Sequence, residues 1–338
     1  MPKHKCEISK KELKLLLSPN PINNYKTMNL VLFFHAVDNI DWFEKTIIVL
    51  KKKFQMINIH QLNQFYKGEL KLSQTCHITV DDGDLSFYNI IFPILKKHNV
   101  PATLFVSPTI CRDSSNFWFQ DLEYLNEEIL IKQIEKNRAM PTNFIKNISD
   151  AKFTLKCLPI NNILGIVHKT MSLQEFTSPP RNISLTQLSE IAESDLVEIG
   201  AHTLNHPILS NENDESSAFE ISESIRQLES HLGKKIRFFA LPNGTPDIDF
   251  GKREIEILKE NKIELCFSTE PKTLSLNDNK LCIPRFSISY GTPKFINLKL
   301  FLFKYWDCIT PFWHPEIKNR KKFRKLVNAN YKTVNIEK

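Results

Sequence analysis

The sequence lacks several features that would place a protein in a class at once. Its seven cysteines are scattered and form no C-x-x-C pair, which argues against a zinc ribbon or a thioredoxin-type motif. No run of about 18 apolar residues occurs, so we expect no transmembrane helix. The apolar run at 15–17 is too short for the core of a signal peptide. These absences lead us to expect a cytoplasmic protein with reduced thiols.

The composition is that of an ordinary globular protein. Of the 338 residues, 41% are hydrophobic and 25% are charged, so we expect a sizeable core in one large domain or two modest ones. The formal net charge of +7 is mild. It is compatible with an anionic substrate, a membrane surface or nucleic acid, but solubility alone explains such a value. We expect no nucleic-acid partner, and the oligomeric state stays open.

Short apolar runs alternate with segments of helical periodicity along most of the chain. The segment 86–98, for instance, carries apolar residues at i, i+3, i+4, i+7 and i+8. This alternation predicts parallel strands joined by helices, in a sheet or a barrel. The seven predicted strands are 29–35, 76–80, 102–106, 196–201, 236–241, 263–267 and 282–288.

The alternation stops between residues 107 and 182. This segment contains an aromatic cluster and ends at a Pro-Pro pair. We interpret it as an insertion or cap within a domain that spans 29–290. It is either an excursion without function or one wall of a substrate groove, and the sequence favours neither. Residues 1–28 are interpreted as an N-terminal extension, and 291–338 as a C-terminal helix with a basic tail. The clustered aromatic residues are Phe117, Trp118, Phe119 and Tyr124.

Polar residues that follow two of the predicted strands suggest a reactive site. Asp81 and Asp82 end one strand, His202 ends another, and His206 follows shortly after. The carboxyl ends of strands in a parallel barrel line one mouth, so these side chains should face the same place. Two histidines and one carboxylate are a common ligand set for Zn²⁺ or a similar ion, provided that the segment after the strand turns helically. The other carboxylate is then available for proton transfer.

Both segments resemble the signature of a known enzyme family. Thr79-Val80-Asp81-Asp82-Gly83 resembles the T-F-D-D-G motif of the polysaccharide deacetylases, carbohydrate esterase family 4, which share the NodB homology domain. His202-Thr203-Leu204-Asn205-His206-Pro207 resembles the family's H-[ST]-x-x-H-P motif. The stretches 92–106 and 198–201 match the usual surroundings of these motifs. The resemblance spans 29–290, with 107–182 matched only loosely.

The resemblance implies a fold and a set of roles. The fold is an α/β, distorted (β/α)₇ barrel, and the reaction is hydrolysis of an N-acetyl or, less often, an O-acetyl group. Asp81 is implied to be the general base that activates water. Asp82, His202 and His206 are implied to hold a divalent metal, usually zinc.

The third motif of the family is less complete in this chain. The segment 239–244 resembles it, which implies an oxyanion or substrate site at Pro242 and Asn243, with the N–H of Asn243 as the donor. The family often begins this motif with an Arg that orients the base, but Ala240 stands near that position. Arg285, in the last predicted strand, is our candidate for that charge. The alternative is that Arg285 is a surface or core-edge residue.

The general acid of the family, usually a late His in an L-x-H context, has no evident counterpart. His35 ends the first predicted strand and should therefore point toward the same mouth. We predict that it donates a proton or binds substrate. His77, inside a strand, and His314, beyond the last strand, are interpreted as structural.

These observations predict a metal-dependent hydrolase that removes an N-acetyl or other acyl group from a sugar or glycan precursor, in bacterial surface polysaccharide metabolism. One alternative is a catalytically inactive carbohydrate-binding protein of the same fold, which the missing acid motif favours and the intact Asp and His set opposes. Another is an amidohydrolase that acts on a non-sugar amide. The apolar stretch 295–303 and the basic tail could also contact an anionic membrane, although a packed helix with a disordered end is the favoured interpretation.

Overall fold

The computed structural model describes residues 28–113, 115–137, 144–288, 290–303 and 322–327. The predicted N-terminal extension lies outside these ranges, apart from its last residue. His314 and the first part of the basic tail also lie outside them. Among the helices that are described, none has the length and apolar character needed to cross a membrane.

The centre of the molecule is a sheet of parallel strands. Its order is β7-β6-β5-β4-β3-β1-β8, and the predicted strands all appear in it. The last three are shorter than predicted, and a strand that the sequence did not reveal, β2, pairs with β3. The bounds are β1 (Leu30–Phe34), β2 (Gln55–Met56), β3 (Thr75–Val80), β4 (Ala102–Val106), β5 (Val197–Ala201), β6 (Phe238–Ala240), β7 (Leu265–Phe267) and β8 (Phe286–Ser287).

Side chains alternate along each strand between two apolar layers. Leu30 and Leu32 of β1 pack in a cluster with Phe43 from a covering helix. Val31, between them, packs in a second cluster with Phe105, which faces it inside the barrel. Because both faces of the strands are buried, they appear in the sequence as continuous apolar runs.

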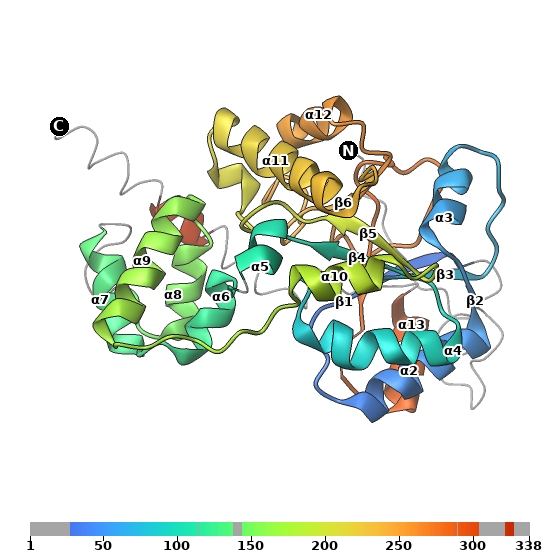
Figure 1. Ribbon diagram of the computed structural model, residues 1–338, viewed down its shortest axis with the longest axis horizontal. Coiled ribbons are helices and arrows are strands. Elements are labelled where there is room, and N and C mark those ends of the chain that lie inside the picture. Colours follow the sequence, from blue (N-terminus) through green and yellow to red (C-terminus); the bar gives the residue numbers. More distant parts are fainter. Residues whose placement is uncertain (1–27, 114, 138–143, 289, 304–321, 328–338) are drawn as a thin grey trace, which may run out of the picture.

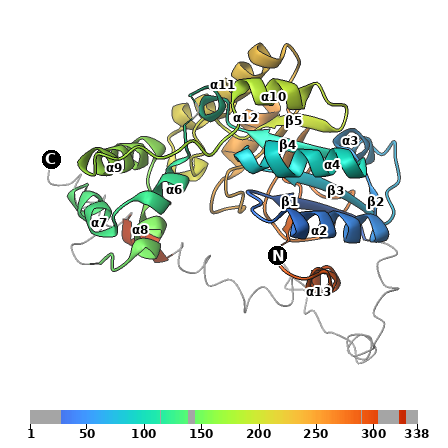
Figure 2. The same ribbon diagram turned by 60° about the horizontal axis from the view of Figure 1, so that its bottom comes forward.

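Helices cover the outer layer of the sheet (Figure 2). Ser184 begins one of them with a capping box, in which Ser184 and Gln187 each accept the other's backbone N–H. A π-helical turn, Phe87–Ile91, occupies the first part of the predicted helix 86–98. The covering helices are α2 (Ile40–Lys53), α4 (Phe92–His98), α5 (Pro108–Asp113), α10 (Leu185–Ala192), α11 (Asp214–Leu232), α12 (Lys252–Glu260) and α13 (Pro293–Phe303).

The sheet curls into a half-barrel, and one segment contacts both of its edges. β8 pairs with β1, and Ile283 forms a parallel bridge with Phe267 of β7. The predicted distorted (β/α)₇ architecture of the α/β class is confirmed. Only Phe286 and Ser287 of the last predicted strand are extended along β1, as expected for an irregular edge that contains Pro284.

Helix α3 (Ile59–Tyr66) covers the amino-terminal end of the barrel. Its apolar residues Ile59, Leu62 and Phe65 belong to the same cluster as Val31 and the other interior side chains. In both views of the molecule, α3 lies at the far end of the sheet from the helices that follow β4 (Figures 1 and 2). The opposite, carboxyl-terminal end of the strands is therefore the open one.

Most of the segment predicted as an insertion, apart from α5 and the residues after α9, folds into helices with a core of their own, which we call the helical lobe (Figure 1). It comprises α6 to α9 and the short helix at 322–327, whose Phe323 and Val327 are buried in that core. The domain limits of 29–290 and 107–182 stay predictions. The lobe helices are α6 (Trp118–Asp121), α7 (Glu127–Lys136), α8 (Ile148–Leu155) and α9 (Ile160–Leu173).

Candidate metal and catalytic site

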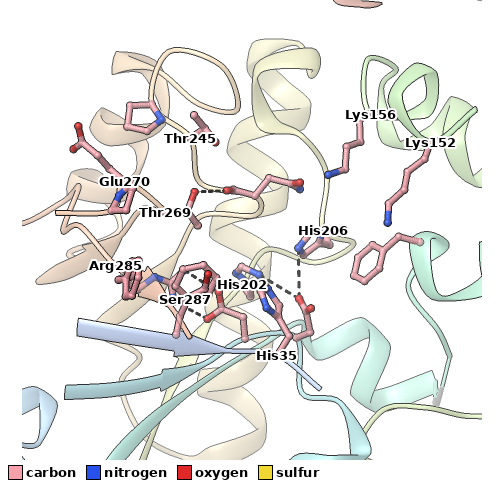
Figure 3. A pocket seen from close by; sticks show the side chains of 18 of the residues that line it. His35, Lys152, Lys156, His202, His206, Thr245, Thr269, Glu270, Arg285 and Ser287 are labelled. Carbon is pink, nitrogen blue, oxygen red and sulfur yellow. Dashed lines mark hydrogen bonds and ion pairs between the residues drawn. The ribbon is translucent and has the colours of Figure 1, made fainter. Parts of the chain in front are cut away.

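A cavity of about 680 Å³ lies at the carboxyl ends of the strands (Figure 3). Its size is that of a site for a small organic ligand. The half-barrel and the helical lobe both contribute to its walls. The half-barrel supplies His35, Asp81, Asp82, His202, His206, Asn243 and Arg285, and the lobe supplies Trp118, Phe119, Lys152 and Lys156.

Backbone geometry directs Asp81 and Asp82 toward different partners. Asp82 has φ 75°, in the left-handed region that residues with a side chain seldom adopt. Asp81 consequently meets Arg285, whereas Asp82 meets His202 and His206. Gly83 follows with φ 77°, and a Cβ there would lie 3.0 Å from the Val106 side chain. The Asp-Asp-Gly turn thus separates two carboxylates that are adjacent in sequence.

Asp82, His202 and His206 bring three metal-ligand atoms together. Oδ1 of Asp82 lies 3.4 Å from Nε2 of His202 and 3.5 Å from Nε2 of His206. The three side chains are buried, and their ligand atoms all lie within 4.8 Å of one another. Within the described part of the chain, this Oδ1 has no hydrogen-bond partner. A buried charged oxygen without a partner is costly, and a cation held by these three atoms removes the cost, so the set fits a divalent metal.

The two histidines are held in different ways. Nδ1 of His202 donates to the carbonyl of Ala240 at 2.7 Å, which leaves the lone pair of Nε2 facing Asp82. Nδ1 of His206 is buried and finds no hydrogen-bond partner among the described residues. The rings of Phe117 and Phe119 contact His206 instead, at centroid distances of 5.3 and 5.0 Å. The barrel therefore fixes one ligand by a hydrogen bond, and aromatic residues of the 107–182 segment pack against the other.

The segment that joins the histidines is a loop and not the helical turn that the spacing argument required, yet the two imidazoles still come together. Thr203 and His206 have φ 63° and 57°, and right-handed helical geometry does not include such values. Glu220 of α11 fastens the loop, because its carboxylate accepts the N–H groups of Leu204 and Asn205 at 3.0 Å each. A buried carboxylate from a separate helix thus sets the separation of the two imidazoles.

The surroundings of Asp82 and His206 favour the protonation states that bind metal, whereas those of His202 favour its protonated form in the absence of a metal. Burial raises the pKa of Asp82, but the neighbouring histidines lower it further, to well below its ordinary value. Burial lowers the pKa of His206 to about 3. Burial acts in the same direction on His202, but its close approach to the Asp82 carboxylate and the charges of both aspartates outweigh it and raise its pKa. Asp82 is therefore ionised and His206 neutral near pH 7, as coordination requires.

Arg285 and Asp81 form a buried ion pair beside the metal-ligand set. The guanidinium donates to the two carboxylate oxygens at 2.7 and 2.8 Å and to Oγ1 of Thr79 at 3.0 Å. The Arg285 side chain is fully buried, so it is no surface residue. Burial raises the pKa of Asp81, but Arg285 outweighs it and holds that pKa below its ordinary value. Asp81 is thus an oriented carboxylate that stays ionised at neutral pH.

Of the remaining predicted site residues, His35 and Asn243 line the cavity and Pro242 does not. His35 is exposed, lines the cavity, and its charge helps lower the pKa values of both aspartates. Asn243, with φ 55°, also lines the cavity, and its carbonyl accepts the Thr269 hydroxyl at 2.6 Å. Pro242 is buried and is not among the residues that line the cavity.

Sequence reasoning missed several residues that the structure brings to the site. Glu220 lies in a helix and carried no motif signal. Lys152 and Lys156 lie within the segment where no pattern was recognised. Their i, i+4 spacing was the available signal, because it places two side chains on one face of a helix.

Comparison with known proteins connects this geometry to a family. The family model described as Polysaccharide deacetylase matches residues 71–265, which is more than half of the chain. That range contains both Asp81–Asp82 and the two histidines. No match is found among curated protein sequences.

Solved structures share the fold. The Streptococcus pyogenes deacetylase PplD, in complex with acetate, is 16% identical with a TM-score of 0.54, over 81% of this chain and 98% of that one. IcaB from Ammonifex degensii is 18% identical with a TM-score of 0.53, over 82% and 97%. A de-N-acetylase from Aggregatibacter actinomycetemcomitans is 18% identical with a TM-score of 0.52, over 81% and 99%. By its matched sequence and its fold, the chain belongs to the polysaccharide deacetylase family.

Proposed function

We propose that this protein is a metal-dependent hydrolase that removes an N-acetyl or other acyl group from a sugar or glycan precursor. One observation carries the proposal: a buried Asp82–His202–His206 set lies beside the Asp81–Arg285 pair in one cavity. Family membership and the printed names of the similar structures, a deacetylase with acetate and a de-N-acetylase, support the same chemistry.

Zinc is the metal that this donor set suits best, since two imidazole nitrogens and a carboxylate oxygen are typical zinc ligands. A metal held by Asp82, His202 and His206 would supply Lewis acidity that polarises an acyl carbonyl and makes water more acidic. The hydrogen bond from His202 to Ala240 and the contacts of Phe117 and Phe119 with His206 orient the two rings for that purpose.

Asp81 is the proposed general base. Arg285 takes one hydrogen-bonding position on each of its oxygens and leaves others free to accept a proton from the attacking water. Because Arg285 also keeps the carboxylate ionised, Asp81 is ready to act across the neutral pH range. Fixing the base in one orientation avoids an entropic cost when the water attacks.

The acyl oxygen and the leaving nitrogen need separate partners. The N–H of Asn243, in the turn after β6, is the proposed donor to the oxygen as it becomes negative. His35, exposed at the end of β1, is the proposed acid that returns a proton to the departing amine. The products are then a free amino sugar and a carboxylate such as acetate.

The test is acetate release from N-acetylglucosamine oligomers by zinc-loaded protein, with chelator-treated protein as the control. We expect release that chelation abolishes and added zinc restores. Oligomer binding without release would instead favour an inactive carbohydrate-binding protein. Release from simple amides, with no activity on the oligomers, would favour a non-sugar amidohydrolase.

A further inference from the structure

We propose that Lys152 and Lys156 form an anion subsite in the cavity, which binds a phosphoryl group of the substrate while its acyl group lies at Asp82 and the two histidines. This inference rests on the proposed function and adds a substrate class to it: phosphorylated N-acyl sugars. It goes beyond the metal site and the base because it concerns the lobe wall of the cavity.

The two lysines face the cavity from one side of one helix. Lys152 lies in α8 and Lys156 is the residue that ends it, so the i, i+4 spacing stacks their side chains on one face. Both line the cavity with Trp118 and Phe119. In Figure 3 their ammonium groups extend from the lobe on the side of His206, opposite Glu270. Two cationic side chains therefore border the space next to the metal-ligand set.

The carboxylates that line the cavity on the barrel side do not account for the placement of Lys152. Asp81 is already neutralised by Arg285, and the metal that Asp82 would share with two histidines compensates its charge. Among the ion pairs found in the described ranges, none involves Lys152. A charge held at a cavity wall without a nearby counter-ion suits an anionic ligand.

The loops of the half-barrel contribute negative charge to the cavity. Asp247 and Glu270 both line the cavity from the loops after β6 and β7, and both are exposed. Glu270 is partly compensated by Lys272 at 3.8 Å, so Asp247 is the more effective anion. An anionic group that entered the cavity would be repelled from the barrel loops and attracted to the lobe. The cavity thus has a polarity that fixes which way a charged substrate lies.

The ligand chemistry follows from the type and number of the cations. Lysine presents a compact point charge and is a common phosphate binder, whereas bidentate carboxylate recognition favours arginine. Two ammonium groups match a phosphoryl group with close to two charges. A cavity of about 680 Å³ has room for a sugar and a phosphoryl group together. The phosphoryl group could belong to a sugar phosphate or to a nucleotide-linked sugar, and the experiment separates these sources.

The experiment compares deacetylation of three substrates by zinc-loaded protein: N-acetylglucosamine 1-phosphate, UDP-N-acetylglucosamine and the neutral N-acetylglucosamine trimer. The variant is Lys152→Gln/Lys156→Gln. The matched control is Lys132→Gln/Lys136→Gln, which removes an exposed i, i+4 pair from α7 of the same lobe that does not line the cavity. Whichever phosphorylated substrate has the higher kcat/KM identifies the source of the phosphoryl group.

We expect the ratio of kcat/KM for phosphorylated over neutral substrate to fall about tenfold in the double variant, mainly through KM, because partly exposed charge pairs contribute modestly. The control should keep the wild-type ratio. Asp247→Asn should raise the ratio, and added salt should lower it for the wild type. An unchanged ratio in the Lys152→Gln/Lys156→Gln variant would overturn the subsite.

Calorimetric binding of UDP-N-acetylglucosamine separates failure of the subsite from failure of the proposed function. If no substrate is hydrolysed but binding weakens about tenfold in the lysine variant alone, the subsite stands and the hydrolase proposal fails. If hydrolysis occurs and neither binding nor the kcat/KM ratio depends on the lysines, the hydrolase proposal stands and the subsite fails. Binding that is absent in the wild type also counts against the subsite.

Discussion

The half-barrel and the helical lobe contribute opposite walls of one cavity and are built in different ways. The centre of the barrel wall is polar, buried and tightly bonded, as the contacts of Arg285 with Asp81, Thr79 and Ser268 show. The lobe wall consists of aromatic rings and flexible lysines on helices. Strand ends are suited to hold reacting groups in one geometry. Helices that pack around a separate core can carry different side chains toward the cavity without disturbing that geometry. We infer that chemistry resides on the barrel and substrate selection on the lobe.

Bonds between the two regions hold the cavity walls together. Nδ2 of Asn211 donates to the carbonyls of Lys156 and Leu158, and Glu212 accepts the N–H of Ile160. Arg324, from the helix at 322–327, bonds to Ile248 and Asn211. The lysine wall is therefore fastened to the barrel near its own position, so a change on one side should reach the other through these contacts as well as through the rings that pack against His206.

The largest expected effect comes from removing a metal ligand on the barrel side. Asp82→Asn or His206→Ala leaves two ligands, and activity should fall at least about 1,000-fold with loss of bound zinc, because the proposed chemistry depends on the ion. Metal analysis and acetate release measure both effects. His231→Ala, an exposed histidine away from the site, is the matched control and should retain both.

Acid should destabilise the barrel more than the lobe. His77 is buried in β3, with Nδ1 at 2.8 Å from the Ile57 carbonyl and Nε2 at 3.0 Å from Oγ1 of Thr103, and burial lowers its pKa to about 4. The unfolded chain takes up a proton first as the pH falls below about 6.5. The stabilisation by neutral His77 is complete above that pH and is lost progressively toward pH 4, by roughly 3 kcal/mol at most.

Denaturant unfolding at several pH values measures this effect. The free energy of unfolding of His77→Gln should depend less on pH between about 6.5 and 4 than that of the wild type. His168→Gln changes an exposed histidine of the lobe and should keep the wild-type dependence. Equal slopes in all three proteins would show that His77 does not carry the effect.

Arg285→Lys should loosen the contact with Asp81 while keeping a positive charge at position 285. Lysine cannot donate to both oxygens of Asp81 as the guanidinium does, so the base loses its fixed orientation. We expect kcat to fall about 10- to 100-fold with zinc content unchanged. Arg237→Lys, which alters a partly exposed arginine outside the cavity, serves as the control. A kcat close to that of the control would show that Arg285 does not orient the base.

Glu220→Gln should have the smallest effect, because it loosens the loop and leaves every ligand in place. An amide keeps the shape of the side chain but cannot accept all of the bonds from Leu204 and Asn205. Zinc affinity should fall about tenfold, as is typical for groups that orient metal ligands. Competition with a zinc chelator measures it, and Glu223→Gln on the same helix is the control. If the two variants bind zinc alike, the loop does not depend on Glu220.

The difference between the walls also explains what could be predicted from the sequence. The barrel and its site follow a simple physical rule, in which apolar runs become buried strands and the polar residue after each strand faces the mouth. That rule brought Asp81, Asp82 and His202 to one place. Arg285 became a candidate through the family resemblance, because the third motif lacks the Arg that orients the base, and the structure places Arg285 against Asp81.

The rest depends on tertiary contacts that leave no local trace. Thr203 and His206 are left-handed without being glycine, so the sequence did not reveal that the segment between the two histidines is a loop. Glu220 acts from a helix distant in sequence. The segment of the helical lobe was recognised as an insertion, but its helices were not predicted, because they are separated by irregular segments and pack around a core of their own.

The most direct test of the central claim is the activity of Asp81→Asn with zinc bound. We expect normal zinc content, because Asp82, His202 and His206 are intact. We also expect kcat for N-acetylglucosamine oligomers to fall at least about 100-fold, since an amide cannot accept the proton. Asp41→Asn, on the exposed face of α2, controls for the loss of a carboxylate. A zinc-loaded Asp81→Asn protein with full activity would contradict the assignment of the base and, with it, the proposed mechanism.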